Sequence, residues 1–118
     1  MSVLYAQSGV IIRPATTTDR YGNKKRDYGD AAERIPVEQL NVQPSGGSTE
    51  DTDDKQVTVT GWLLISAPGT MPDLRETDRI EVDGIGADGQ ALEVAGKVGR
   101  WPAPFEMRHI EAQLKEVA

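Results

Sequence analysis

Residues 55–66 read K-Q-V-T-V-T-G-W-L-L-I-S and form the most strand-like run of the chain. Val57 and Val59 alternate with two threonines, which is the period of a half-buried strand. Gly61 interrupts this alternation, and the W-L-L-I that follows it is typical of a strand that is buried on both faces or bends round a barrel. We therefore expect an all-β fold that includes this segment.

Four further runs alternate apolar and polar residues and end at turn residues. Pro14 ends the first run because proline lacks the N–H that a strand ladder needs. Asp88-Gly89 is typical of a hairpin turn between the last two runs. This spacing predicts a small antiparallel β-barrel or sandwich, formed as a single domain over residues 1–118. The runs are G-V-I-I-R (9–13), V-E-Q-L-N-V-Q (37–43), where a change of phase indicates a bulge, R-I-E-V-D (79–83) and A-L-E-V-A-G-K-V (91–98).

The apolar positions of these runs predict the core. Side chains of a strand point alternately to its two faces, so one apolar set in each run faces inward. The residues expected in the core are Trp62, Ile80, Val82, Leu92, Val94 and Val98.

The C-terminal run H-I-E-A-Q-L-K-E-V (109–117) fits two kinds of secondary structure. Ile110, Leu114 and Val117 would share one face of a helix, whereas Ile110, Ala112 and Leu114 would share one face of a strand. The content of Ala, Gln, Leu, Lys and Glu favours the helix slightly.

Composition excludes several classes of protein. The chain has 118 residues, which suits one domain, and its formal net charge of −6 argues against general nucleic-acid binding, which needs clustered Lys and Arg. It has no cysteine and one histidine, which excludes disulfides, zinc–thiolate sites and multi-histidine metal clusters. We expect no secretory signal and no membrane span, because the longest apolar run is W-L-L-I. The protein is expected to work where it is made or within a particle assembled there.

Two long segments of opposite charge separate the predicted strands. Residues 14–36 are expected to form one long loop, which contains R-Y-G-N-K-K-R, and residues 44–54, P-S-G-G-S-T-E-D-T-D-D, are expected to form a second. Loops of this length in a compact domain are usually functional or disordered. Their opposite charges predict contacts with different neighbours. The basic residues are Arg20, Lys24, Lys25 and Arg26, and the acidic ones are Glu50, Asp51, Asp53 and Asp54.

We expect no catalytic residue, metal or cofactor. The aspartates that begin at Asp51 invite comparison with a calcium loop, but such a loop needs glycine at its sixth position and glutamate at its twelfth, where this chain has Gln56 and Trp62. His109 has no cysteine, serine motif or second histidine to complete a nucleophilic site. An outward-facing strand position explains Glu81 more simply than acid–base catalysis does. The chain is therefore not expected to be an enzyme.

The run G-R-W-P-A-P-F (99–105) places two large aromatic side chains, Trp101 and Phe105, on a segment that is stiffened by two prolines. One interpretation is a strap that seals the open end of a barrel. The other is a partner-binding patch, since aromatic residues dominate protein interfaces. The two interpretations are compatible.

Four motifs follow one another between residues 57 and 117. They are V-T-V-T-G-W-L-L-I-S-A-P-G, T-D-R-I-E-V-D-G, L-E-V-A-G-K-V-G-R-W-P-A-P-F and H-I-E-A-Q-L-K-E-V. In order and spacing they resemble the head-to-tail stopper (head closure) proteins of long-tailed bacteriophages. The resemblance covers about residues 37–118.

This resemblance implies a small antiparallel β-barrel, with a strand in place of the helix at the C-terminal run. It also implies a virion protein, assembled in the host cytoplasm, whose copies form a ring between the portal or adaptor and the tail terminator or tail tube. Such a ring helps retain packaged double-stranded DNA without reading its sequence. On this hypothesis Glu50, Asp51, Asp53 and Asp54 line the channel and repel the DNA backbone. The four basic residues contact a neighbouring subunit or the adaptor, and Trp101 and Phe105 also bind a partner.

Two alternatives remain open at this point. Within the same class, the chain would be a tail terminator or another connector ring protein. In a different class, it would be an OB-like barrel that binds single-stranded nucleic acid through Tyr21, Tyr28 and the basic segment, because aromatic side chains stack on bases.

Overall fold

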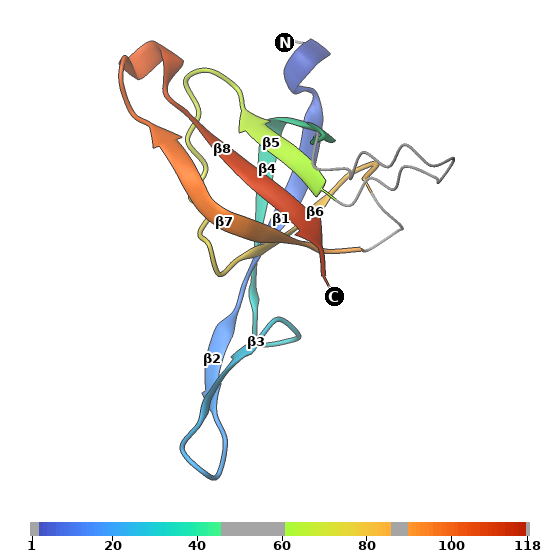
Figure 1. Cartoon of the computed structure of the whole chain (residues 1–118), viewed down its shortest axis with the longest axis vertical. Helices are drawn as coiled ribbons and strands as arrows, with labels where there is room; N and C mark the ends of the chain where they lie inside the picture. The colour runs from blue at the N-terminus through green and yellow to red at the C-terminus, as the bar shows by residue number, and fades with distance from the viewer. Residues whose placement is uncertain (1–2, 46–60, 86–89, 118) are drawn as a thin grey trace, which may run out of the picture.

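The computed structural model describes residues 3–45, 61–85 and 90–117, and these residues form an all-β fold, as predicted (Figure 1). Six strands close into a barrel in the order β1-β4-β5-β8-β7-β6, and β2 pairs with β3 in a separate two-stranded sheet. The strands are β1 (Gln7–Arg13), β2 (Ala15–Thr18), β3 (Lys24–Asp27), β4 (Glu33–Pro44), β5 (Gly61–Ser66), β6 (Arg79–Val82), β7 (Leu92–Trp101) and β8 (His109–Glu116), with short 3-10 turns η1 (Val3–Tyr5) and η2 (Phe105–Met107).

The C-terminal run is the strand β8, so the helical pattern was misleading and the strand implied by the resemblance is confirmed. β8 pairs with β5 on one edge and with β7 on the other. Its alternate residues Ile110, Ala112 and Leu114 are buried. Backbone hydrogen bonds on both edges, together with this burial, outweigh the small helical preference of the composition.

The bulge expected in residues 37–43 is present. Gln7 pairs with Leu40 whereas Gly9 pairs with Val37, so two residues of β4 lie opposite one residue of β1. Gln39, within the bulge, has a positive φ of 59°. The extra residue changes the phase of β4, which lets both Val37 and Leu40 contact the core.

Five of the six residues predicted in the core are buried. Trp62 is the exception: it is partly buried and packs against the core from the start of β5. Its indole Nε1 is shielded from solvent and has no hydrogen-bond partner among the residues the structure describes. The five buried residues are Ile80, Val82, Leu92, Val94 and Val98.

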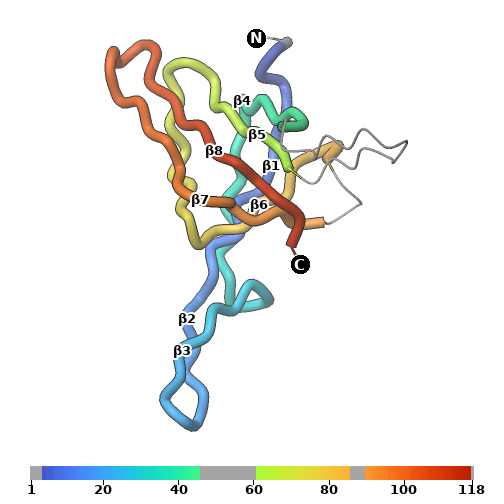
Figure 2. Tube along the Cα trace, in the orientation of Figure 1, coloured from blue at the N-terminus to red at the C-terminus, as the bar shows by residue number. Residues whose placement is uncertain are grey.

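The prediction of one loop over residues 14–36 is wrong. Ala15–Thr18 pairs antiparallel with Lys24–Asp27, and we call this hairpin, residues 15–27, the arm. It projects from the barrel as an extension of β1 and β4 (Figures 1 and 2). Three consecutive β-branched threonines favour the strand, and Gly22, at φ 83°, closes the turn. β4 then begins at Glu33, within the segment that was expected to be loop.

A loop between β5 and β6, residues 67–78, covers one end of the barrel, and we call it the capping loop. Its Leu74 is 1% exposed and belongs to the core cluster. A residue outside the strands can reach the interior of a closed barrel only through an open end. The capping loop therefore helps to seal the barrel. Residues 99–105 were also expected to seal an open end, and their Phe105 is exposed.

Gly9 lies where β1 and β6 close the barrel, and it has no room for a side chain. A Cβ atom at this position would lie 2.5 Å from the backbone oxygen of Glu81. We expect Gly9→Ala to push β1 and β6 apart and to lower the free energy of unfolding by about 1–3 kcal/mol. Denaturant unfolding measures the loss, and hydrogen exchange of the β1 and β6 amides locates it.

The control for this prediction is Gly29→Ala, the same substitution at an exposed turn. There the new Cβ would meet only a carboxylate oxygen of the Asp27 side chain, at 3.1 Å. That side chain can move, so a small change is expected. Equal losses of unfolding free energy in the two variants would show that the close approach of β1 and β6 at Gly9 is not the cause.

Candidate interaction site

The arm carries positive charges that have no counter-ion in the described residues. Lys24, Lys25 and Arg26 line a cleft of about 730 Å³ between the arm and the barrel, and Arg79 of β6 lines it from the other side. None of these four side chains forms an ion pair within the described part of the chain. Glu93, the carboxylate in the cleft, pairs with Lys115 at 3.3 Å. The cleft is therefore a positively charged surface on an acidic protein.

The two tyrosines of the basic segment have different environments. The guanidinium carbon of Arg79 lies 3.8 Å from the centre of the Tyr28 ring, and the Tyr28 hydroxyl donates to the carbonyl of Thr77 at 2.7 Å. Tyr28 therefore fastens the base of the arm to the barrel. Tyr21, in the turn at the tip, is 75% exposed and is contacted by Arg20. Of the two, Tyr21 is the one that is open to a partner.

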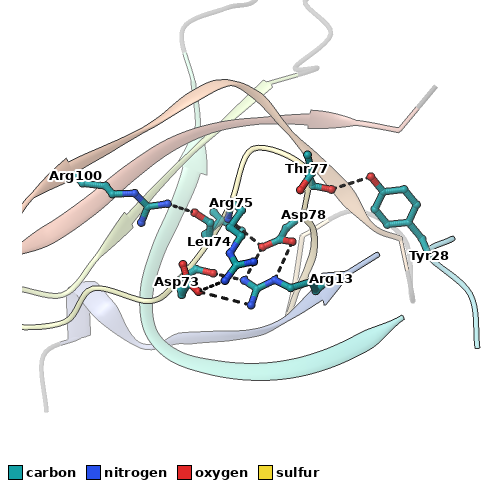
Figure 3. Close-up of polar contacts among 8 residues, drawn as sticks. All are labelled: Arg13, Tyr28, Asp73, Leu74, Arg75, Thr77, Asp78 and Arg100. Carbon is teal, nitrogen blue, oxygen red and sulfur yellow. Dashed lines mark hydrogen bonds and ion pairs between the residues drawn. The ribbon is translucent and has the colours of Figure 1, made fainter. Parts of the chain in front are cut away.

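A buried ion pair joins the capping loop to β1 where the arm begins (Figure 3). Arg13 donates two hydrogen bonds to the Asp78 carboxylate, at 3.0 and 3.3 Å, and a third to the carbonyl of Asp73. The Asp78 carboxylate, which is wholly buried, also accepts from the backbone N–H of Arg75 at 2.9 Å. The hydrogen bond from Asp78 raises the pKa of Arg13. This pair could not be predicted from the sequence, because nothing near either residue signals the other.

Further contacts hold the same loop in place. Arg75 pairs with Asp73 at 3.0 Å, and this hydrogen bond lowers the pKa of the Asp73 carboxyl group. Arg100 of β7 donates to the carbonyl of Leu74 at 2.6 Å. The base of the arm therefore rests on a loop that is fixed to both β1 and β7.

Apolar side chains gather at the other end of the barrel from the arm. Trp101 is 45% exposed, and Phe105 and Met107 of the adjoining 3-10 turn are more exposed still. A depression of about 480 Å³, which we call the aromatic groove, is lined by Trp101, Met107, Pro104, Tyr5, Ile65 and Pro68, with His109 and Glu111 as polar members. Trp101 and Phe105, both predicted to contact a partner, are therefore accessible.

His109 sets the position of Trp101 in this groove. The two rings stack with their centroids 5.1 Å apart and their planes 2° apart. Nδ1 of His109 lies 2.9 Å from the carbonyl of Met107, and Nε2 lies 3.0 Å from the Glu111 carboxylate. An acceptor lies beside each nitrogen, and only the protonated ring can donate to both. The Met107 carbonyl and then Glu111 raise the pKa of His109.

This raised pKa predicts a pH dependence of stability. The contribution of protonated His109 is present in full below the ordinary pKa of 6.5 and is lost as the pH rises through the raised value. Because the chain has one histidine, proton NMR of an untagged protein reports this titration directly. We expect a midpoint above 6.5 that Glu111→Gln lowers. A midpoint at or below 6.5 in the unaltered chain would contradict the two acceptor contacts.

The four carboxylates predicted to line a channel, Glu50, Asp51, Asp53 and Asp54, lie outside the described residues. Within residues 3–45, 61–85 and 90–117, no group of three or more potential metal ligands occurs. The same residues contain no helix long and apolar enough to cross a membrane.

Comparison with known proteins identifies the fold and no family. No protein-family model matches the chain, and no curated protein matches it. Among solved structures, the chain is similar to the solution structure of protein SF1141 from Shigella flexneri 2a, with a TM-score of 0.57. The match covers 100% of this chain and 98% of that one, at 16% sequence identity. At this level of identity the similarity shows the fold alone.

Proposed function

We propose that this chain is a structural subunit of a phage head–tail connector, where its copies form a ring that joins the portal or adaptor to the tail and helps retain packaged DNA. The observation that carries the proposal is the basic arm that projects from a closed barrel (Figure 1). A projecting hairpin whose cations form no ion pair with the described residues suits contact with another protein better than a role within its own domain.

Two further features support a subunit that has neighbours. Trp101 of the aromatic groove and the neighbouring Phe105 are both exposed, and aromatic side chains are enriched at protein interfaces. The motifs of residues 57–117 resemble the head-to-tail stopper family in order and spacing. A tail terminator or another connector ring protein is the alternative within the same class. The proposed contact between Glu50–Asp54 and the DNA channel rests on sequence alone.

An OB-like module for single-stranded nucleic acid is the second candidate. The exposed Tyr21 beside basic residues favours it, because bases stack on aromatic rings. Two observations weigh against it. The OB fold has five strands whereas this barrel has six, and Tyr28 is already occupied by Arg79 and Thr77.

Localisation in purified particles tests the proposal. Particles from cells that produce the chain should contain it at the head–tail joint, visible by antibody labelling in electron microscopy and by cross-links to portal and tail proteins. Absence of the chain from filled particles would contradict the proposal. A salt-sensitive gel shift with single-stranded oligonucleotides, combined with that absence, would favour the OB-like module.

A further inference from the structure

The tip of the arm is a small turn whose shape is fixed by hydrogen bonds to Asp19. The Asp19 carboxylate accepts hydrogen bonds from the backbone N–H groups of Tyr21 at 2.8 Å and of Asn23 at 2.9 Å. These bonds hold the turn while leaving the Tyr21 ring exposed, with Arg20 beside it. Tyr and Arg are among the residues that contribute most to binding energy at interfaces, and a rigid turn reduces the entropy lost on binding.

The aromatic groove has the complementary chemistry. Trp101, Pro104 and Met107 provide an apolar surface for a ring, and the stack on His109 fixes the orientation of Trp101. Glu111 is the carboxylate that lines the groove. Arg108 also lies nearby, but its guanidinium group covers the Phe105 ring at 3.9 Å and its Nε donates to the carbonyl of Gly69 at 3.0 Å.

Charge distribution makes a second copy of the chain a suitable occupant. The arm contains four of the 13 basic residues and two of the 19 acidic residues. The other residues therefore carry nine basic and 17 acidic side chains, so the arm of one copy is attracted to the remainder of another copy. Such complementarity favours encounter and fixes the register of the contact.

The arm projects from one end of the molecule, whereas η1 and the connection between β7 and β8 lie at the other end (Figures 1 and 2). Residues of these two segments line the groove, so one chain cannot fill its own groove. We propose that the arm tip of one copy, led by Tyr21 and Arg20, docks in the aromatic groove of the next. This contact joins different surfaces of the two copies, and such head-to-tail contacts close into rings when the rotation permits. The inference rests on the proposed function, for which it specifies how neighbouring ring subunits meet.

Sedimentation of the full chain over a range of concentrations tests this contact. The unaltered protein should self-associate, and more weakly as salt is added. Tyr21→Ala in the arm and Trp101→Ala in the groove should each weaken the association constant by at least ~30-fold, the factor expected for an interface hot spot. Far-UV circular dichroism verifies that both variants keep the β fold.

A mixture of the two variants gives the sharper result. Tyr21→Ala keeps an intact groove and Trp101→Ala keeps an intact arm, so together they can form one contact but cannot extend it. We expect a one-to-one dimer in the mixture where each variant alone is a monomer. This dimer also shows that neither variant is misfolded.

Three results would overturn the inference. They are an unaltered chain that stays monomeric up to about 1 mM, variants that associate as strongly as the unaltered chain, and a mixture that forms no dimer. The fate of the proposed function is separate. If the chain lies at the head–tail joint but neither substitution weakens its self-association, only the proposed contact is wrong. If the chain self-associates as proposed but is absent from particles, only the connector role is wrong.

Discussion

Asp78→Ala is expected to lower the free energy of unfolding by about 3–5 kcal/mol, because it removes the buried carboxylate that pairs with the partly buried Arg13 guanidinium. The substitution removes both hydrogen bonds from Arg13 and the one from the backbone N–H of Arg75. Removal of one partner of a buried ion pair is costly since the remaining charge stays out of water. Urea unfolding followed by circular dichroism measures the loss.

Asp73→Ala is the matched control for this prediction. Asp73 lies in the same capping loop and also pairs with Arg13, at 3.6 Å, but its side chain is 62% exposed. Exposed pairs contribute roughly 0–1 kcal/mol, so a small change is expected. The double variant Arg13→Met with Asp78→Leu should regain much of the loss, because apolar replacement of a whole buried pair is often neutral. Equal effects of Asp78→Ala and Asp73→Ala would contradict the importance of burial.

Leu74→Ala is expected to lower the free energy of unfolding by about 2–5 kcal/mol, the range for truncation of a fully buried leucine. Leu74 is the residue of the capping loop that enters the core, so its loss leaves a cavity at the end of the barrel. The loop is held by Arg13 and Arg100 and cannot easily collapse into that space. Thermal and urea unfolding both report the change.

Leu4→Ala makes the same chemical change at an exposed position and serves as the control. Leu4 is 66% exposed, so its truncation should alter stability by less than about 0.5 kcal/mol. A loss at Leu74 as small as that at Leu4 would show that the capping loop does not seal the barrel.

The hairpin of the arm could not be predicted from the pattern of apolar and polar residues. In β3, K-K-R-D has no apolar alternation because the strand has no buried face, so the main signal of a strand is missing. The three threonines and the Asp19–Gly22 turn were weaker signals that favoured a hairpin. The charges in this segment were recognised, but their display on a projecting hairpin was not.

Two residues at the candidate site were predicted from the sequence, but their grouping with other residues was not. Trp101 and Phe105 were recognised as large side chains on a proline-stiffened segment, and they are accessible. The association of Trp101 with Tyr5 and Pro68 in one groove involves segments that are distant in the chain. The stack between Trp101 and His109 likewise depends on the pairing of β7 with β8.

The all-β class, the bulge in β4 and most core positions follow from the order of residues, because the two faces of a strand alternate residue by residue and that rule is local. The choice of strand over helix at His109–Glu116, the entry of Leu74 into the barrel and the pairing of Arg13 with Asp78 do not follow from any local rule. Arg13 and Asp78 are 65 residues apart, and the energy that joins them exists only after the chain has closed and excluded water from the space between them.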